Sequence, residues 1–303
     1  MESIAVSASG LCKSYDGKTD ALHGLDLEIP EGGVFGFLGP NGAGKTTTVK
    51  LLNGLLKPTS GTCLVLGEVP YVKPQEVHRV CGVMTDSARM YGQLTGMQNL
   101  IFFARMFGMP EEECGRRAAE LLRRLDLWDA RDRRLSEYST GMAQRLSFAR
   151  ALVGRPKVLF LDEPTSGLDP ESAQTVNGMI AELAGSEGTT VFLCTHQLRY
   201  AQDICTAYGI LNRGSLIASG SLEELSRGIG LPIRAQIRIG AEDSLEGFEK
   251  QEDFWEAPVQ REEDMPALVR RVVTAGHDIY GARLVKPTLE EVYFQYVDRG
   301  VSG

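Results

Sequence analysis

Hydrophobic and polar positions along the chain follow two periods, and the changes between them outline the fold. Five segments in the N-terminal third are apolar or alternate between apolar and polar, and they predict β-strands: residues 4–11, 25–29, 34–39, 61–67 and 79–85. A glycine-rich turn, Gly39 to Gly44, separates the third of these segments from a stretch of helical periodicity. The pattern therefore predicts strands, a turn and a helix in close succession.

Strand patterns are absent from about residue 86 to 155, where the periodicity is helical. Residues 96–108 and 111–127 predict two helices, and a third begins at Ser139. The apolar face of that third helix consists of Met142, Leu146, Ala149 and Val153. This block predicts an all-helical subdomain.

Strands resume after the helical block and complete an α/β pattern. Residues 157–164 and 189–196 predict strands that are each followed by a helix, and short strands follow at 207–212 and 215–220. Strand–helix alternation on both sides of a helical block predicts an α/β core that carries a helical insertion. We expect this domain to cover residues 1–227, with the helical subdomain at about 86–155.

The C-terminal residues 228–303 have a different pattern and predict a small α+β appendage. It would begin with a linker at 228–232 and a strand at 233–240, followed by a weakly patterned acidic stretch at 242–263. Its last part is interpreted as helix, strand and helix: residues 264–276, 279–285 and 288–297.

The composition of the chain argues against several classes of function and location. The 303 residues are 43% hydrophobic and 24% charged, and a net charge of -8 argues against nucleic acid as a partner. The six cysteines include no CxxC pair, which is typical of a reducing compartment. The N-terminus lacks a signal-peptide pattern, and no run reaches the roughly 18–20 apolar residues that span a bilayer. These features predict a cytosolic chain.

A phosphate-binding motif follows the third predicted strand. The nonapeptide GPNGAGKTT, Gly39 to Thr47, matches the pattern G-x-x-x-x-G-K-[ST]. Its glycines let successive backbone N–H groups face a phosphate at the positive end of the next helix. Lys45 would contact the β- and γ-phosphates, and the Thr46 hydroxyl could bind Mg²⁺.

An acidic pair ends a later strand. The apolar run from Val158 to Leu161 is typical of a strand that is buried on both faces, and Asp162 and Glu163 follow it directly. Ligands of α/β sheets bind at this carboxyl edge. Asp162 would complete the magnesium site, and Glu163 could orient or deprotonate the attacking water. The alternative is an acidic pair that caps a helix.

Three further residues are individually weak candidates. Tyr15 could stack on adenine or belong to the core. His196 ends a predicted strand, where it could reach a γ-phosphate or be structural. Asp169, in the sequence SGLDP, could simply cap the helix that begins at Pro170.

In this order, the motifs resemble those of the ATP-binding subunits of ABC transporters. Tyr15 is similar to the adenine-stacking aromatic, GPNGAGKTT to the Walker A motif and VLFLDEP to the Walker B motif. SGLD looks like the D-loop, and His196 looks like the switch histidine. YSTGMAQRL, residues 138–146, lies where the family has its LSGGQ signature. The resemblance covers residues 4–225.

The resemblance implies the fold of a P-loop ABC ATPase, with ATP and Mg²⁺ as cofactors and Glu163 and His196 as catalytic residues. It implies an ATP site on one copy formed by Tyr15, Gly39, Asn41, Gly42, Ala43, Gly44, Lys45, Thr46 and Thr47. In this family two such domains pack head to tail, so the other copy would contribute Ser139, Thr140, Gly141, Met142 and Asp169 in trans. The implied magnesium ligands are Thr46, Asp86 and Asp162. Ser139 is also a good N-cap, so a plain capped core helix is the alternative for this segment.

Two departures from the family pattern matter. The signature has Thr140 and Met142 where the commonest form has Gly and Gln. Asp86 stands where the family usually has Gln. A carboxylate there would repel an approaching γ-phosphate unless a metal neutralises it, so we hypothesise a stricter requirement for Mg²⁺. Unchanged magnesium dependence of hydrolysis in Asp86→Asn would contradict this hypothesis.

Within the family, the chain resembles subunits that serve ABC-2-type exporters. This implies an integral membrane permease as partner, a homologous subunit or a second copy as the other half of the pair, and a peripheral location at the cytoplasmic face. A coupling helix of the permease would enter a groove lined by residues such as Met90, Tyr91, Leu94 and Phe102, although these could equally be core. The alternative function is an ABC ATPase outside transport, either ribosome- or DNA-associated. A single phosphate loop, the absence of a coiled-coil stretch and the acidic charge disfavour it.

Overall fold

The computed structural model describes residues 3–15, 17, 19–85, 90–240 and 245–301. The chain divides into two compact units, Met1–Ser219 and Gly220–Gly303. The strands of the first unit are β1 (Ile4–Ser14), β2 (Asp20–Pro30), β3 (Val34–Leu38), β4 (Ser60–Val65), β5 (Cys81–Met84), β6 (Val158–Asp162), β7 (Thr190–Thr195), β8 (Ala207–Asn212) and β9 (Ser215–Gly220). Its helices are α1 (Lys45–Leu52), α2 (Pro74–Val80), α3 (Gly96–Met106), α4 (Glu111–Arg124), α5 (Thr140–Leu152), α6 (Pro170–Ser186) and α7 (Leu198–Ile204).

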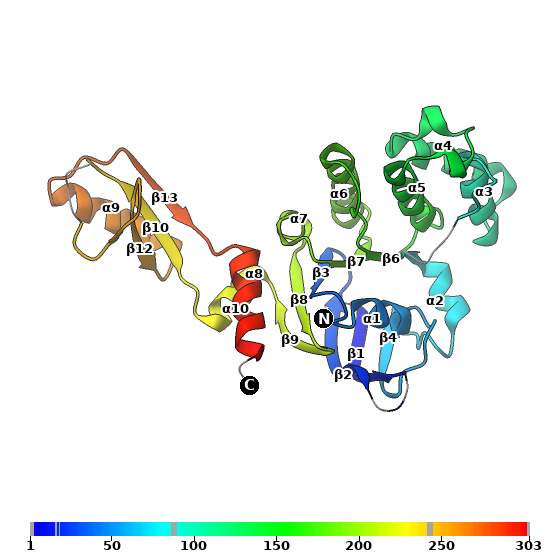
Figure 1. The fold of residues 1–303 in the computed structure, drawn as a ribbon, viewed down its shortest axis with the longest axis horizontal. Helices are drawn as coiled ribbons and strands as arrows, with labels where there is room; N and C mark the ends of the chain where they lie inside the picture. Colours follow the sequence, from blue (N-terminus) through cyan, green and yellow to red (C-terminus); the bar gives the residue numbers. More distant parts are fainter. Residues whose placement is uncertain (1–2, 16, 18, 86–89, 241–244, 302–303) are drawn as a thin grey trace. The chain divides into compact units, whose positions relative to one another are not determined.

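A six-stranded sheet forms the centre of the first unit, in the order β5-β6-β7-β3-β8-β9 (Figure 1). Four neighbouring pairs are parallel: β5 with β6, β6 with β7, β7 with β3, and β3 with β8. Every residue of β3, β6 and β7 is buried, as their continuous apolar runs require of strands that are covered on both faces. Parallel direction places the carboxyl ends of these three strands at one edge of the sheet.

An antiparallel sheet, in the order β2-β1-β4, lies in the same unit. Its apolar side chains join those of α1 and β3 in one core, in which Leu11, Leu25, Phe37 and Leu52 are fully buried. The first unit therefore combines a mixed sheet system with surrounding helices, which confirms the predicted α/β class.

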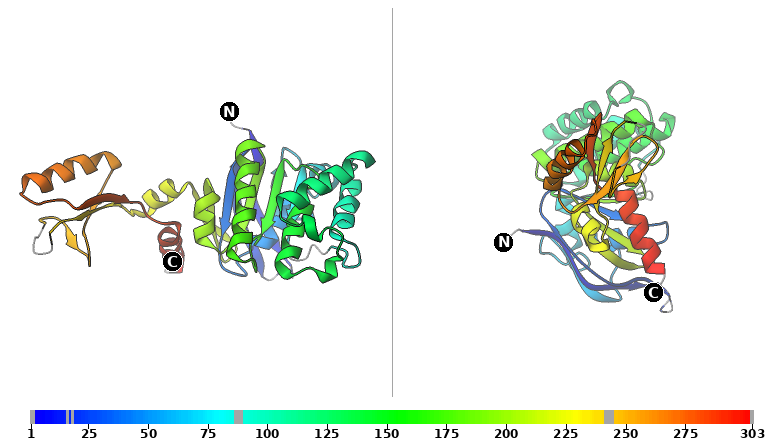
Figure 2. Two further views of the ribbon diagram at one scale, coloured as in Figure 1. Left: turned by 90° about the horizontal axis from the view of Figure 1, so that it is seen from above. Right: turned by 90° about the vertical axis from the view of Figure 1, so that its left-hand side faces the viewer.

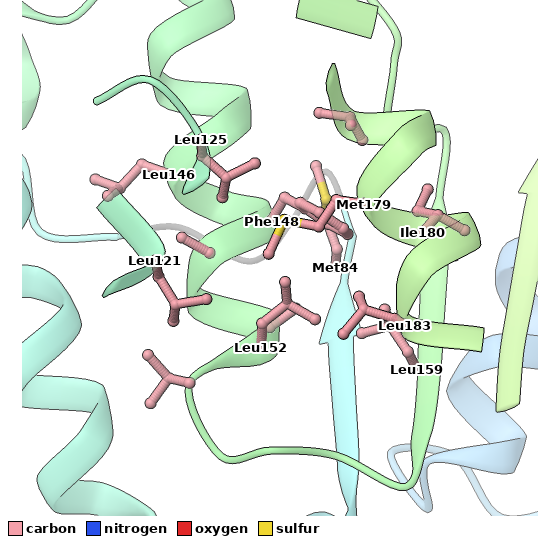
Figure 3. Packing of buried hydrophobic residues seen from close by; sticks show 14 of the residues in the cluster. Met84, Leu121, Leu125, Leu146, Phe148, Leu152, Leu159, Met179, Ile180 and Leu183 are labelled. Atoms are coloured by element: carbon pink, nitrogen blue, oxygen red, sulfur yellow. The ribbon is translucent and has the colours of Figure 1, made fainter. Parts of the chain in front are cut away.

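The segment between β5 and β6 contains α3, α4 and α5, which gather beside the sheet (Figure 1). Helix α5 is the central one. Figure 3 shows Phe148 and Leu152 of α5 between Met84 and Leu159 of the sheet and Met179 of α6. Of the apolar face predicted for this helix, Leu146, Ala149 and Val153 are fully buried and Met142 is partly buried against the same core. Phe148 and Leu152, which were not predicted, anchor α5 to the sheet and α6.

The second unit has a sheet and helices of its own. Its elements are α8 (Leu222–Ile229), β10 (Ile233–Arg238), β11 (Glu249–Lys250), β12 (Trp255–Val259), α9 (Met265–Thr274), β13 (Gly281–Val285) and α10 (Leu289–Val301). The antiparallel sheet has the order β11-β12-β10-β13, and α9 lies along one face of it (Figure 2, left). Helix α10 is tied to α8, because the Tyr296 hydroxyl donates to the Leu225 carbonyl at 3.1 Å.

Three local predictions were wrong or incomplete, and the proposed domain boundary lies a few residues from the division between the two units. The predicted linker at 228–232 begins inside α8, which continues to Ile229 because Gly230, with φ 73°, terminates it in the left-handed conformation. The stretch at 242–263 contains β11 and β12, whose pairing depends on β10 rather than on a local pattern. Helix α2 was not predicted, and it takes up the first two residues of the strand expected at 79–85. The proposed domain boundary at 227/228 falls within α8, which groups with the second unit.

Candidate functional site

The predicted motifs meet at the carboxyl edge of the central sheet. Leu38, the last residue of β3, pairs with Thr195 of β7, and Asp162 at the end of β6 pairs with Cys194 of β7. The phosphate loop, the acidic pair and His196 follow these three neighbouring strands. Registration of the parallel sheet therefore brings together side chains that are more than a hundred residues apart in sequence.

The phosphate loop ends at Gly44, which has φ 111° and is the N-cap of α1. A side chain there would collide with Leu22 and with the Ala21 carbonyl, so this position requires glycine. No side chain caps α1, and the N–H groups of its first turn lack intrahelical acceptors. Such a helix start favours a bound anion.

Lys45 begins α1 and is buried, at 7% exposure. Its ammonium group donates to the carbonyl oxygens of Gly39 and Pro40, two residues of the loop itself. A buried ammonium needs such partners, and phosphate oxygens could replace them. The Lys45 side chain thus folds back onto the phosphate loop and binds two of its backbone carbonyls.

Two of the predicted magnesium ligands are in contact. The Thr46 hydroxyl donates to Asp162 Oδ2 at 2.8 Å, and Asp162 is buried. Within the described ranges, no three His, Cys, Asp or Glu side chains form a cluster that could hold a metal ion by themselves. Mg²⁺ is usually bound by one or two carboxylates together with substrate phosphates, so a hydroxyl and one carboxylate beside a phosphate loop fit it. Asp86 lies outside the described residues.

Glu163 is held in an unusual backbone conformation. Its φ of 50° is in the left-handed region, which for a residue other than glycine costs about 1–3 kcal/mol. Its N–H donates to the Cys194 carbonyl at 2.9 Å, so β7 stabilises this conformation. Strain of this kind is concentrated at functional sites.

The Glu163 carboxylate is fixed by the end of β7. Thr195 Oγ1 donates to Oε2 at 3.1 Å, and the His196 N–H donates to Oε1 at 3.0 Å. His196 Nδ1 lies 2.7 Å from the same Oε1, while 57% of the His196 side chain is exposed. The largely buried carboxylate and the exposed imidazole thus form one unit at the carboxyl edge of the sheet. This geometry suits a group that orients water.

Buried thiols in the first unit are poor candidates for a nucleophile. Burial raises the pKa of Cys63 to about 11 and that of Cys81 to about 12. Burial also raises the pKa of Cys194 well above its ordinary value. Because the thiolate is the reactive form, these side chains are inert at neutral pH.

Tyr15 is 62% exposed, which excludes the core alternative. Its hydroxyl is 3.2 Å from Thr47 Oγ1, next to the phosphate loop, and Lys13 Nζ lies 5.6 Å from the ring centroid. An exposed ring beside the loop is available for stacking on a base.

The signature segment forms the exposed N-terminus of α5. Ser139 is the N-cap, and its hydroxyl accepts from the Met142 N–H at 3.2 Å. Ser139 and Thr140 are exposed, whereas Met142 packs against the helical core. Tyr138 anchors the segment, because its hydroxyl donates to the Ala130 carbonyl at 2.8 Å. The helix is therefore capped, yet it presents its first turn to solvent.

The predicted D-loop lies against the signature segment. A Cβ atom placed on Gly141 would be 3.5 Å from Leu168 Cδ2. Asp169 caps α6, accepting from the Ser172 N–H at 2.9 Å and from the Ser172 hydroxyl at 2.8 Å. These bonds, the backbone one first, lower the pKa of the Asp169 carboxyl. The capping interpretation of Asp169 is thus correct for the folded chain.

Sequence reasoning missed Gln144. It lies on α5, and its side-chain amide donates to the carbonyl oxygens of Glu163 and Pro164 at 3.2 and 3.3 Å. A glutamine inside a helix carries no sequence signal of such a contact, because its acceptors are 19 and 20 residues away.

The apolar residues proposed to line a groove are partly core and partly surface. Tyr91 is 51% exposed and meets the Phe102 ring edge-on, with centroids 4.9 Å apart. Met90 packs against the helical core. Among helices of the described ranges, none is both long and apolar enough to cross a membrane.

The sequence of this chain is similar to those of known ATP-binding proteins. Residues 22–166 match the family described as ABC transporter. A daunorubicin/doxorubicin resistance ATP-binding protein, DrrA of Streptomyces peucetius, is 43% identical over 226 residues, which are 75% of this chain and 68% of that protein. The daunorubicin resistance ATP-binding protein DrrA3 of Streptomyces coeruleorubidus is 37% identical over 97% of this chain and 96% of its own length.

A solved ATP-binding cassette, described as a dimeric post-hydrolysis state bound to ADP and Pi, is 25% identical with a TM-score of 0.66. The match covers 71% of this chain and 98% of the cassette. The chain therefore belongs to the ABC transporter family, as an ATP-binding and ATP-hydrolysing subunit that powers transport.

Proposed function

We propose that two copies of this chain pack head to tail, with each ATP held between the phosphate loop of one copy and the signature segment of the other. The observation that carries this proposal is the exposed start of α5, where Ser139 and Thr140 face solvent at a helix N-terminus. The same chain has a phosphate loop whose lysine and threonine already have partners. An exposed helix start is complementary to the phosphates of an ATP on another copy. A homologous nucleotide-binding subunit could replace the second copy.

In each site the residues have separate roles. Gly39, Asn41, Gly42, Ala43 and Gly44 supply the loop backbone, Lys45 and Thr47 bind phosphate, and Tyr15 stacks on adenine. Thr46, Asp162 and Asp86 would hold Mg²⁺, which neutralises phosphate charge when it is bound. Glu163 orients the attacking water, and His196 steadies the terminal phosphate. Ser139, Thr140, Gly141, Met142 and Asp169 of the partner copy close the site.

Complementation tests the shared site. The Lys45→Ala variant lacks its own phosphate-binding lysine, and Gly141→Asp places a negative charge at the signature. Space exists for that side chain, since the nearest heavy atom is 3.5 Å from the added Cβ. Each variant alone should be inactive, whereas a mixed pair contains one intact site and should regain ATP hydrolysis. Mixed pairs without activity, or full specific activity in strictly monomeric wild-type chain, would contradict the shared site.

The membrane partner would dock on the surface of the helical block. We propose that Tyr91 and Phe102 contact a coupling helix of the permease, which would hold the chain at the cytoplasmic face. The exposed Tyr91 ring, packed edge-on against the half-buried Phe102, supports this contact. Tyr91→Asp should weaken co-purification with the membrane permease that assembles with this chain, while ATP binding stays unchanged. Unchanged co-purification would remove this part of the proposal.

The exported compound is proposed from similarity alone. Relatives of this chain are named for daunorubicin and doxorubicin resistance, so we propose a planar, amphipathic polycyclic compound as the cargo. Membranes that contain the chain and its permease should show ATPase stimulation by such compounds. A control with Glu163→Gln should show none. Lack of stimulation by any polycyclic compound, with ATPase activity intact, would argue for a different cargo.

A further inference from the structure

Helix α5 connects the exposed signature segment with the strained residue Glu163. Gln144 lies on α5 one turn after the signature, and its Nε2 donates to the Glu163 carbonyl at 3.2 Å. The same amide donates to the Pro164 carbonyl at 3.3 Å. A single side chain thus holds two successive carbonyls of the acidic loop.

Glu163 is held from two sides as a result. On one side β7 binds its N–H through the Cys194 carbonyl and binds its carboxylate through Thr195 and His196. On the other side Gln144 binds its carbonyl. With φ at 50°, this residue depends on its surroundings to keep its conformation. Loss of one side would free the backbone that carries the catalytic carboxylate.

Gln144 lies between an exposed and an anchored part of α5, so a movement of the helix tip can reach it. The C-terminal half of α5 is anchored, because Phe148 and Leu152 are fully buried and Arg150 donates to the Val83 carbonyl at 2.9 Å. The N-terminal tip with Ser139 is exposed. Gln144 is half-buried between the two. A small displacement of the tip relative to the anchored half therefore acts on the turn that contains Gln144.

We infer that Gln144 is a positioning residue that couples the signature segment of a chain to Glu163 of that same chain. Contact of the tip with the ATP held by the partner copy is then transmitted through Gln144 to the carboxylate that serves the chain's own ATP. This inference rests on the proposed shared site, and it supplies a physical link between the two sites of a pair.

The first test is Gln144→Met, which keeps the length and volume of the side chain but removes both donors. We expect kcat to fall about tenfold, ATP affinity to stay within about twofold, and the Hill coefficient for ATP to fall from above 1 to 1. Arg145→Met is the matched control. Arg145 lies on the same turn and donates to the Leu125 carbonyl at 2.9 Å in the helical block, away from Glu163.

A purely structural role of Gln144 would change thermal stability and leave the Hill coefficient as in the wild type. That outcome would overturn the coupling, as would a Hill coefficient of 1 in the wild-type chain or an equal loss of cooperativity in the Arg145→Met control. Gln144→Glu places an oxygen against the two carbonyls, so its kcat should be lower still than that of Gln144→Met.

Mixed pairs separate action within one chain from action on the partner. In each pair one copy carries Glu163→Gln, so a single Glu163 remains. With Gln144→Met in the copy that keeps Glu163, we expect activity about tenfold below that of the reference pair. With Gln144→Met in the Glu163→Gln copy, we expect activity within about twofold of the reference.

The reverse ranking, or equal losses in both pairs, would overturn the inference. Failure of the shared site itself is recognised separately, because the Lys45→Ala and Gly141→Asp mixture would then stay inactive whatever residue occupies position 144.

Discussion

The proposed ATP site has a phosphate half, formed by the phosphate loop and the acidic pair, and a signature half, formed by the start of α5. The two halves differ in how many of their polar groups have hydrogen-bond partners within the chain. In the phosphate half, Lys45, Asp162 and Glu163 are buried or half-buried, and each side chain has partners inside the chain. In the signature half, Ser139 and Thr140 are exposed, and the cap satisfies only the Met142 N–H. The first half is preorganised, whereas the second presents a helix start to solvent.

The side chains of the two halves are also positioned by different parts of the fold. Parallel strands place the phosphate half, because Leu38, Asp162 and Thr195 end neighbouring strands in fixed register. The signature half is positioned by the burial of α5 in the helical core, as Figure 3 shows for Phe148 and Leu152. In the proposed pair, the first half binds the nucleotide, and the second half contacts the nucleotide that is bound to the other copy.

The largest effect is expected in the phosphate half from Glu163→Gln. Removal of the carboxylate proposed to orient the attacking water should reduce ATP turnover on the order of 10²- to 10⁴-fold, the range for a positioned acid–base group. ATP binding should persist, and a closed pair should accumulate on size-exclusion chromatography with ATP. Glu171→Gln, an exposed acidic residue in the first turn of α6, is the control. Rapid hydrolysis by Glu163→Gln would contradict the role of this residue.

Lys45→Ala should weaken ATP binding rather than turnover alone. Each charge-assisted bond to phosphate contributes about 1.5–3 kcal/mol, so the Kd for ATP should rise roughly 10- to 100-fold. Isothermal titration measures this directly. Lys50→Ala, in the last turn of the same helix, should leave the Kd unchanged and so controls for charge and for helix stability. Equal effects in the two variants would remove the specific role of Lys45.

Ser139→Ala tests the signature half, and Ser221→Ala is a matched control. Both serines are N-caps, and each accepts from the N–H three residues later at 3.2 Å. Each variant should lose about 1 kcal/mol of helix stability, measured by denaturant unfolding. Only Ser139→Ala should also weaken ATP-dependent pairing, by about tenfold. If both variants pair like the wild type, then Ser139 is a cap and nothing more.

The smallest effect is expected from Asp169→Asn, and it depends on pH. The bonds from Ser172 lower the pKa of Asp169 in the folded chain. The carboxylate therefore stabilises the fold above its unfolded pKa of about 3.9, and this contribution disappears as pH falls through the lower folded pKa. Asp169→Asn should thus be slightly less stable than the wild type at pH 7 and equal to it in strong acid. Thermal melts across pH measure the difference, and a pH-independent difference would exclude the carboxylate as its source.

The second unit shows the limits of pattern reasoning. Helix α8 carries Ser221 and Glu224 at capping-box spacing, a local signal of a helix start from which no helix was predicted. Strands β11 and β12 gave a weaker local signal, because β12 pairs along its whole length with β10, from Ile237 opposite Trp255 to Ile233 opposite Val259. Strands that form through pairing with residues far away in the sequence carry only a weak local sequence signal.

The phosphate loop, the acidic pair after a buried strand and the helical block could be predicted from local patterns, because glycine placement and hydrophobic period are local properties. The order of the motifs, and with it the family, also follows from the sequence. Only the tertiary structure decided that Glu163 has a left-handed backbone, that His196 lies 2.7 Å from its carboxylate and that Gln144 binds its carbonyl. Those contacts join residues from β6, β7 and α5, and their geometry exists only after the sheet and the helical core have formed.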